Sequence, residues 1–197
     1  MRRMPYETEM KRLREFLKEH KLTLVKLIAK GHSSFVFLVR KGDKKLVAKL
    51  EREDSTREGM IEKEVANLKK ANSLNVGPKL YGFDKKRKII LMEYIEGKTF
   101  NEWLFEKRKR AELIRFLAEL FRQAIALDNA GLDHGQLTGR GVNILVRDGL
   151  PVIIDFEKAS QKRKPHNFSK LLAYLLINKK SRICARVWEI LQAEEKN

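Results

Sequence analysis

The hydrophobic pattern changes from strand-like to helical near Glu96-Gly97, and this change constrains the fold more than any other feature of the chain. Before this dipeptide, short apolar runs alternate with turns, as in β-strands. After it, apolar residues recur mainly at helical spacing over long segments. A β-rich first half joined to a mainly helical second half predicts an α+β protein with two lobes. We expect an N-terminal helix over residues 1–21, an N-lobe over 22–95 and a C-lobe over 96–197.

The same pattern places the individual elements. Leu13, Phe16 and Leu17 fall on one face of an amphipathic helix expected over residues 7–20. The other expected helices cover residues 56–72, 100–108, 111–130, 167–178 and 181–193, and the clearest strands cover 35–39, 46–48, 79–83, 88–94, 142–146 and 152–156.

The composition describes a folded and strongly basic protein. Of 197 residues, 43% are hydrophobic, which is enough to bury a core. Lys and Arg number 43 against 26 Asp and Glu, which gives a formal net charge of +17. Such an excess attracts polyanions, above all nucleic acid, although a solvated basic surface without such a partner remains an alternative. A charged fraction of 35% is also typical of proteins from thermophiles.

Cysteine usage and the apolar runs bear on the compartment. Cys184 is the single cysteine, which excludes a disulfide scaffold and a four-thiolate zinc site and fits a reducing compartment. No apolar run approaches the roughly 20 residues of a membrane span, and the first residues lack the apolar core of a signal peptide. We therefore expect a cytoplasmic protein without a transmembrane segment and without a membrane partner.

A turn around Gly31 is the first candidate site. The small residues of 29–34 let backbone N–H groups approach phosphate oxygens, and Val36 would cover an adenine. Because Gly31 is the only glycine of this turn, an ordinary β-hairpin is the alternative interpretation.

A lysine at the end of an apolar strand is the second candidate. Lys49 closes Val47-Ala48-Lys49, and an inward lysine is costly unless it meets an anion. Glu64 precedes the apolar Val65 in the next helix and could point its carboxylate toward Lys49. Such a strand–helix ion pair holds the α- and β-phosphates of a nucleotide. The alternative is a lysine whose charged end reaches past the sheet edge into solvent.

Two polar segments of the second half meet apolar strands. The loop 134–141 runs directly into the strand that contains Asn143, and the next strand delivers Asp155 at its end. Asn and Asp oxygens at the mouths of adjacent strands suit Mg²⁺, which prefers hard oxygen ligands. Taken alone, Asp155 could instead cap a helix or stabilise a turn.

The order and spacing of these segments resemble the protein-kinase-like superfamily over about residues 25–160. Gly31 matches a glycine of its Gly-rich loop, Lys49 the phosphate-binding lysine and Glu64 the partner glutamate. The segment 91–97 looks like the hinge that hydrogen-bonds adenine, which implies that the cofactor-binding residues include Met92, Glu93 and Ile95.

The catalytic part of the resemblance lies in the second half. His134-Gly135-Gln136-Leu137 with Asn143 resembles the catalytic loop, and Asp155-Phe156-Glu157 resembles the metal-binding Asp-Phe-Gly. The resemblance implies a bilobed protein-kinase-like fold, ATP and Mg²⁺ as cofactors, and Asn143 and Asp155 as metal ligands. It also implies a catalytic set made up of Gln136, His134, Lys49 and Asp155.

The chain departs from the kinase pattern at several positions. Gln136 stands where the family has its catalytic aspartate, and Asn143 follows it by seven positions instead of five. Two glycines of the nucleotide loop are replaced by Ala29 and Ser34, and no Ala-Pro-Glu segment follows Asp155. These changes leave ATP and metal binding intact and disfavour a protein substrate.

Replacement of the aspartate by Gln136 does not by itself remove activity. Phosphoryl transfer has a loose transition state, so positioning and charge neutralisation supply most of the catalysis. Gln136 could orient the attacking hydroxyl while Lys49 and Mg²⁺ neutralise charge, and Asp133 or His134 could take the proton.

Basic runs in the second half suggest where a polyanion binds. They lie beside the expected catalytic segments and together suit a phosphodiester backbone, although each one alone could be a solvated helix end. The candidate RNA-binding residues are Lys107, Arg108, Lys109, Arg110, Lys162, Arg163 and Lys164.

Within its superfamily the chain looks most like small atypical archaeal kinases of the Bud and RIO types. Among these it resembles archaeal RNA kinases that phosphorylate a ribose 2′-hydroxyl in the variable loop of tRNA. We therefore expect an ATP- and Mg²⁺-dependent kinase acting on an RNA 2′-hydroxyl, with tRNA as partner. A serine/threonine protein kinase that phosphorylates itself and an RNA-binding pseudokinase are the alternatives, and the oligomeric state and the choice between ATP and GTP stay open.

Overall fold

The computed structural model describes residues 6–55, 59–139 and 141–193. The chain divides into two compact units, each of which is described by itself. Unit 1 comprises residues 1–69 and 78–94, and unit 2 comprises residues 70–77 and 95–197. The lobe and N-terminal helix bounds expected from the sequence stay a prediction.

Unit 1 is built on a five-stranded antiparallel sheet with the strand order β1-β2-β3-β5-β4. Its β2–β3 hairpin pairs Lys41 with Lys44 across a two-residue turn, and Gly42 supplies the left-handed φ of 59° that this turn requires. The strands are β1 (Thr23–Lys30), β2 (Ser34–Lys41), β3 (Lys44–Glu51), β4 (Leu80–Asp84) and β5 (Ile89–Glu93).

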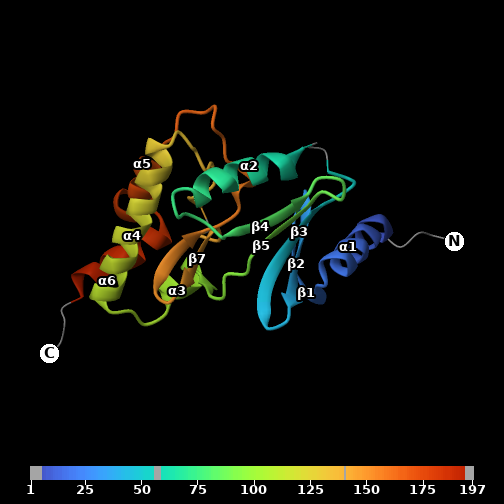
Figure 1. Ribbon diagram of the computed structural model, residues 1–197. Helices are drawn as coiled ribbons and strands as arrows, with labels where there is room; N and C mark the ends of the chain where they lie inside the picture. Colours follow the sequence, from blue (N-terminus) through green and yellow to red (C-terminus); the bar gives the residue numbers. More distant parts are fainter. Residues whose placement is uncertain (1–5, 56–58, 140, 194–197) are drawn as a thin grey trace. The chain divides into compact units, whose positions relative to one another are not determined.

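Helix α1 (Glu7–His20) packs on one face of this sheet and completes the core of unit 1 (Figure 1). Its apolar stripe buries Leu13 and Phe16 completely or nearly so, as the helical spacing of these residues predicts. The strands supply the alternate residues of the same core, among them Phe35, Phe37 and Leu50. The opposite sheet face is therefore left to the other residues of each strand.

The opposite sheet face carries the residues expected to bind a nucleotide. Val36 pairs with Lys49 across β2 and β3, and Val47 pairs with Met92 across β3 and β5. Because cross-strand partners point to the same side, these four side chains share one face. Helix α2 (Met60–Asn72), whose residues up to Lys69 belong to unit 1, approaches this face through Glu64.

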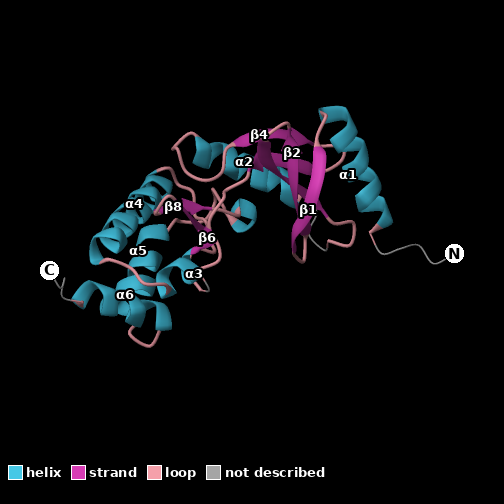
Figure 2. Ribbon diagram, turned by 90° about the horizontal axis from the view of Figure 1, so that it is seen from below, coloured by secondary structure: helices cyan, strands magenta, loops and turns pink. Residues whose placement is uncertain are grey.

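Unit 2 combines a small sheet with a group of helices (Figure 2). Three aromatic rings fill its centre: Phe116 stacks on Phe100 at 5.0 Å and on Trp103 at 4.7 Å between ring centroids. The sheet order is β6-β7-β8. The elements are β6 (Lys98–Thr99), α3 (Phe100–Phe105), α4 (Arg110–Asn129), β7 (Ile144–Arg147), β8 (Leu150–Ile153), a 3₁₀ helix (Phe156–Lys158), α5 (Asn167–Leu172), a π-helix (Ala173–Ile177) and α6 (Arg182–Gln192).

Some element bounds differ from the sequence-based expectation. The strand expected over residues 152–156 covers Leu150–Ile153, because edge strand β8 tolerates Pro151 and Asp155 adopts a left-handed φ of 66° that ends the strand. The helix expected over 167–178 changes to π-helical geometry after Leu172. The expected start of the second helix at residues 56–58 lies outside the described residues.

The mixed sheet-and-helix architecture confirms the α+β bilobed kinase-like fold class. Within the described residues, no helix has both the length and the apolar character needed to span a bilayer.

Candidate functional site

The strongest candidate feature of unit 1 is a buried ion pair between Lys49 and Glu64. Lys49 Nζ lies 2.7 Å from Glu64 Oε2, and the two side chains are 7% and 3% exposed. Burying both charges is expensive, so such a pair is weak support for stability and marks a place where function can require charge. The ion pair expected from the sequence is thus present in the fold.

The turn before β2 forms a closed loop of backbone hydrogen bonds. Gly31 N–H donates to Ser34 O at 2.8 Å, and Arg52 N–H donates to Ser33 O at 2.9 Å. The loop ends at Ser34, two residues before the half-buried Val36, which lies on the sheet face opposite α1. A compact loop next to this face can present backbone donors to phosphate oxygens.

The side chain of Arg52 stabilises this loop by a hydrogen bond. Its Nη1 donates to Gly31 O at 2.9 Å, while Nε and Nη2 donate to the Asp54 carboxylate at 2.8 and 2.6 Å. The guanidinium also lies 5.3 Å from the Phe35 ring centroid. Hydrogen bonding by Arg52 lowers the pKa of Asp54. Arg52 is a positioning residue that the sequence analysis missed, since only its position directly after β3 hinted at a role.

The expected hinge residues are divided between the units. Met92 lies in β5 and is 8% exposed, whereas Ile95 belongs to unit 2 and is 5% exposed. Glu93 N–H donates to Lys79 O at 2.8 Å, and Glu93 Oε2 accepts from Lys79 N–H at 3.1 Å. The amide hydrogen of Glu93 is therefore engaged by Lys79, the residue before β4, and the role of the hinge residues stays a prediction.

The polar loop of unit 2 that contains Gln136 is anchored by His134. This ring is fully buried; Nε2–H donates to Ile154 O at 3.0 Å, and Nδ1 accepts from Gln136 N–H at 3.3 Å. Burial lowers its pKa to about 4, so the imidazole is neutral at pH 7. Both ring nitrogens thus have hydrogen-bond partners within the protein, and the catalytic role expected for His134 stays a prediction.

Asp133, the neighbour of His134, is buried between two basic partners. It is 2% exposed, and its carboxylate lies 2.8 Å from Arg163 Nε and 3.5 Å from Lys170 Nζ. Its backbone also pairs with Ser160. Asp133 therefore joins the loop that contains His134 to the segment after the 3₁₀ helix. The sequence does not predict this contact, because Ser160 and Arg163 lie about 30 residues further along the chain.

Gln136 and Asn143 meet despite the two additional residues between them. Asn143 Nδ2 donates to Gln136 O at 2.9 Å. The longer connection is accommodated by Gly139, whose φ of 113° is accessible mainly to glycine, and by Tyr174, whose hydroxyl donates to Gly139 O. The loop thus preserves the proximity of the two residues that the kinase pattern needs.

Asp155 lies beside Asn143 at the end of the small sheet. Ile154 N–H donates to Asn143 O at 2.9 Å, which fixes the two segments side by side. Carboxylate oxygens of Asp155 and Glu157 lie within 4.8 Å of each other. Carboxylate oxygens are hard donors of the kind that Mg²⁺ prefers, and the roles of Asn143 and Asp155 as metal ligands stay a prediction. Glu157 was expected only as the third residue of the Asp-Phe-Glu motif, and its carboxylate is a further potential metal ligand.

Residues 12–173 match the RIO domain. The chain belongs to the RIO domain family. RIO domains are kinase-like, so this protein is an atypical kinase-like protein, and its family implies phosphotransfer with ATP.

Two curated relatives extend the comparison of the RIO domain. The chain is 38% identical over 109 residues to "KEOPS complex subunit Bud32" of Pyrococcus abyssi, covering 55% of this chain and 46% of that protein. It is 29% identical over 84 residues to "Uncharacterized protein MJ1211" of Methanocaldococcus jannaschii, covering 43% of this chain and 71% of that protein. The alignment with the Bud32 subunit thus spans about half the length of that relative.

The basic residues expected to bind RNA do not all face solvent in this RIO domain. Arg108 donates from Nε to Trp103 O at 2.8 Å, pairs with Glu106 and lies over the Trp103 ring. Arg163 pairs with Asp133, as described above, and also donates to Lys158 O at 2.6 Å. Both arginines therefore have intramolecular partners, and their role in RNA binding stays a prediction. Arg163 is nevertheless exposed, and so are Lys107, Lys109, Arg110, Lys162 and Lys164.

Proposed function

We propose that this protein is an ATP- and Mg²⁺-dependent kinase that transfers the γ-phosphate to a ribose 2′-hydroxyl of RNA, with tRNA as substrate. The buried Lys49–Glu64 pair is the observation that carries the phosphotransfer part of this proposal. A lysine held by a buried carboxylate keeps its charge and its position while it binds phosphate oxygens.

Unit 1 supplies the nucleotide-binding residues in this proposal. Lys49 contacts the α- and β-phosphates, the loop at Gly31 presents backbone donors, and Val36 and Met92 cover the base from the sheet face they share. Arg52 keeps the Gly31 carbonyl turned toward itself, which orients the loop for phosphate binding.

Unit 2 supplies the metal ligands and the group that orients the acceptor. Asp155 and Asn143 would hold Mg²⁺, and Glu157 is close enough to Asp155 to contribute. When bound, the ion neutralises charge on the phosphates during transfer. Gln136 hydrogen-bonds the acceptor hydroxyl and fixes its direction, and its own place is set by Asn143 and His134.

Gln136 cannot take a proton as a carboxylate does, and His134 and Asp133 are buried among their partners. We therefore propose that the hydroxyl proton leaves to a phosphoryl oxygen or to solvent, which a loose transition state tolerates because little negative charge is needed on the nucleophile. Catalysis then rests on position and charge, at the cost of the roughly 10²- to 10⁴-fold contribution of a general base.

The preference for RNA over protein rests on charge. A net charge of +17 and the exposed cations at Lys107, Lys109, Arg110, Lys162 and Lys164 favour a polyanionic substrate. The longer loop between Gln136 and Asn143 is one further departure from enzymes that phosphorylate proteins. We also propose that the protein works in the cytoplasm and that its lobes divide near residue 95.

The test is transfer of labelled phosphate from γ-labelled ATP and Mg²⁺ to bulk tRNA or to basic proteins. Label in tRNA supports the proposal, label only in protein favours the serine/threonine kinase, and RNA binding without any label favours the pseudokinase. Lys49→Met and Asp155→Asn should abolish transfer. The exposed Lys44→Met and Asp148→Asn are matched controls on β3 and on the β7–β8 turn, and they should transfer normally.

A further inference from the structure

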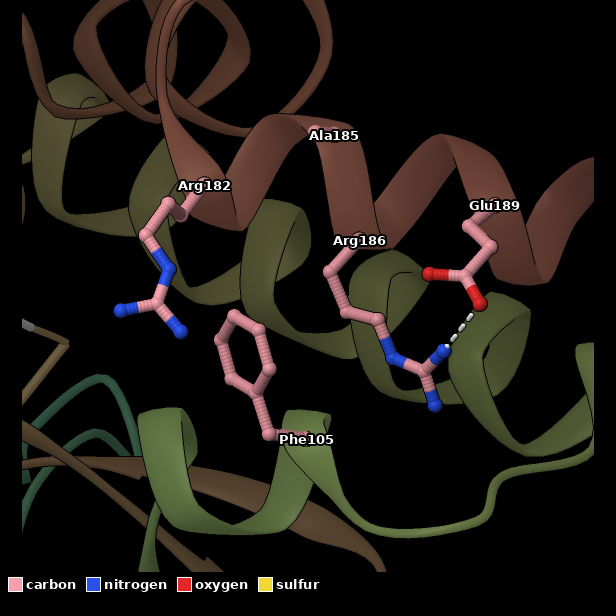
Figure 3. Close-up of a pocket in the computed structure, with 5 residues that line it drawn as sticks. All are labelled: Phe105, Arg182, Ala185, Arg186 and Glu189. Atoms are coloured by element: carbon pink, nitrogen blue, oxygen red, sulfur yellow. Dashed lines mark hydrogen bonds and ion pairs between the residues drawn. The ribbon is translucent and has the colours of Figure 1, made fainter.

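A groove between helices α3 and α6 of unit 2 is not used by the proposed reaction. It has a volume of about 370 Å³ and is lined by Phe105, Arg182, Ala185, Arg186 and Glu189 (Figure 3). An aromatic ring, two guanidinium groups and one carboxylate thus meet in one depression of the surface.

Phe105 and Arg182 form the open side of the groove. Phe105 is 42% exposed, so part of its ring is open to contact from solvent. The guanidinium of Arg182 lies 5.3 Å from the ring centroid. In the described part of the chain, Arg182 has no carboxylate partner, so its charge is available to an anion.

Arg186 forms the fixed side. It donates to Leu104 O at 3.3 Å and to Glu106 O at 3.0 Å, and so binds the end of α3 to α6. Its Nη1 also lies 2.7 Å from Glu189 Oε1. The charge of Glu189 is therefore balanced within the groove wall, and Arg182 gives the groove a net positive charge.

The rims of the groove are basic on both sides. Lys107, Lys109 and Arg110 follow Phe105 within five residues and are exposed. Lys179 and Lys180 precede Arg182 within three residues and are also exposed. Because Phe105 and Arg182 are in contact, these two basic segments approach the same end of the groove.

We propose that this groove binds an unpaired nucleotide of RNA. The base stacks on Phe105, Arg182 contacts the adjoining phosphate, and the rim cations track the backbone on either side. A ring paired with an unpaired guanidinium complements a base and a phosphate at once, which is how proteins hold single-stranded nucleic acid. An acidic peptide would pair with the basic side chains but would make no stacking contact with Phe105. An anionic membrane would need more than one exposed aromatic ring.

This proposal rests on the proposed function and adds to it the structural class of RNA that the kinase binds. Binding at the groove itself requires no phosphotransfer. The site gives a loop or strand end a place to dock, so RNA with unpaired nucleotides should bind better than duplex of equal length.

The test is binding of fluorescein-labelled 12-nucleotide RNA, measured by fluorescence anisotropy, with the full chain carrying Asp155→Asn so that no turnover occurs. Single-stranded RNA should bind more tightly than the same sequence in duplex form. Phe105→Leu, which keeps apolar packing, should weaken single-strand binding by roughly 5- to 150-fold, the range for one lost base stack. Arg182→Gln should weaken single-strand binding and lower the slope of log K against log salt by about one.

Ile114→Ala and Arg115→Gln remove an exposed apolar and an exposed basic side chain from α4 and serve as controls; they should bind as the parent does. Thermal unfolding of each variant checks the fold. Unchanged affinity for folded Phe105→Leu and Arg182→Gln overturns the proposal, and so does equal binding of duplex. Tighter binding of a glutamate-rich peptide or of phosphatidylserine vesicles than of RNA overturns it as well.

The two proposals fail separately. Groove-dependent RNA binding by a protein whose parent form labels no RNA would remove the kinase function and keep the groove. Labelled tRNA at the parental rate and affinity with Phe105→Leu and Arg182→Gln would keep the kinase and remove the groove.

Discussion

Lys49 and Glu64 form an ion pair that joins strand β3 to helix α2 within unit 1, with 2.7 Å between Nζ and Oε2. Neither side chain has access to enough water to keep an unpaired charge solvated, because both are at least nine-tenths buried. Removing one partner therefore leaves a charge in a medium that disfavours it.

The first prediction concerns stability. Lys49→Met and Glu64→Leu should each lower the free energy of unfolding by about 3–5 kcal/mol, because each leaves the other charge buried without its partner. The double variant should be more stable than either single variant. Urea unfolding of all four proteins measures this cycle. Additive losses in the double variant would show that the two side chains do not interact.

The same cycle separates folding from activity. The double variant should fold and yet transfer no phosphate, because the lysine that binds the nucleotide is missing. Transfer by a folded double variant would exclude Lys49 from the reaction.

The second prediction concerns pH. Burial lowers the pKa of His134 from 6.5 to about 4, so the unfolded chain binds more protons than the folded chain between these values. Stability is therefore complete at neutral pH and is lost as the pH falls through this window. From pH 7 to pH 5 the loss from this residue is about 2 kcal/mol.

Urea unfolding of the parent and of His134→Gln at pH 7 and pH 5 isolates this contribution. The variant should be less stable at pH 7 and should lose less on acidification. The exposed His20→Gln is the control and should show the parental dependence. An identical pH dependence in the parent and His134→Gln would contradict the buried neutral imidazole.

The third prediction concerns the nucleotide loop. Arg52→Ala removes the donor to Gly31 O and should raise the KM for ATP roughly tenfold while kcat changes less, because the loop loses its brace and the reacting groups stay in place. Arg40→Ala, an exposed arginine on β2, is the matched control. An unchanged KM for ATP in a folded Arg52→Ala protein would mean that the loop keeps its shape without this residue.

The fourth prediction concerns the RNA footprint. Replacing Lys107, Lys109 and Arg110 by Gln should weaken tRNA binding and lower the slope of log K against log salt by about 2 to 3, one for each lost phosphate contact. Arg108→Gln should instead lower thermal stability, since this side chain holds Trp103 and Glu106. A triple variant with the parental salt slope would place the RNA elsewhere.

The sequence predicted those features whose residues stand close along the chain or share one periodic element. The α+β bilobed class and the kinase-like family follow from the change in periodicity and from motif order, and both are confirmed. The pairing of Lys49 with Glu64 could be expected because a lysine inside an apolar strand requires an anion and the next helix offers one. The roles of the site residues stay a proposal.

The missed features are long-range pairings and burial. A basic residue type does not reveal which partner its side chain meets: Arg163 pairs with Asp133, 30 residues away, and Arg108 lies over the Trp103 ring. The basic runs in which these two arginines lie do not predict either contact. His134 is another such case, because its enclosure depends on Ile154 and Phe156, which come from a later segment.

Mapping the phosphate on tRNA tests the central claim most directly. After incubation with γ-labelled ATP and Mg²⁺, the tRNA is hydrolysed in alkali, which cleaves RNA only where the 2′-hydroxyl is free to attack the neighbouring phosphodiester. We predict label in an alkali-resistant dinucleotide with the parent protein, and none with Lys49→Met or Asp155→Asn. Label released as mononucleotide or found only in protein, or full labelling by either variant, would contradict the account.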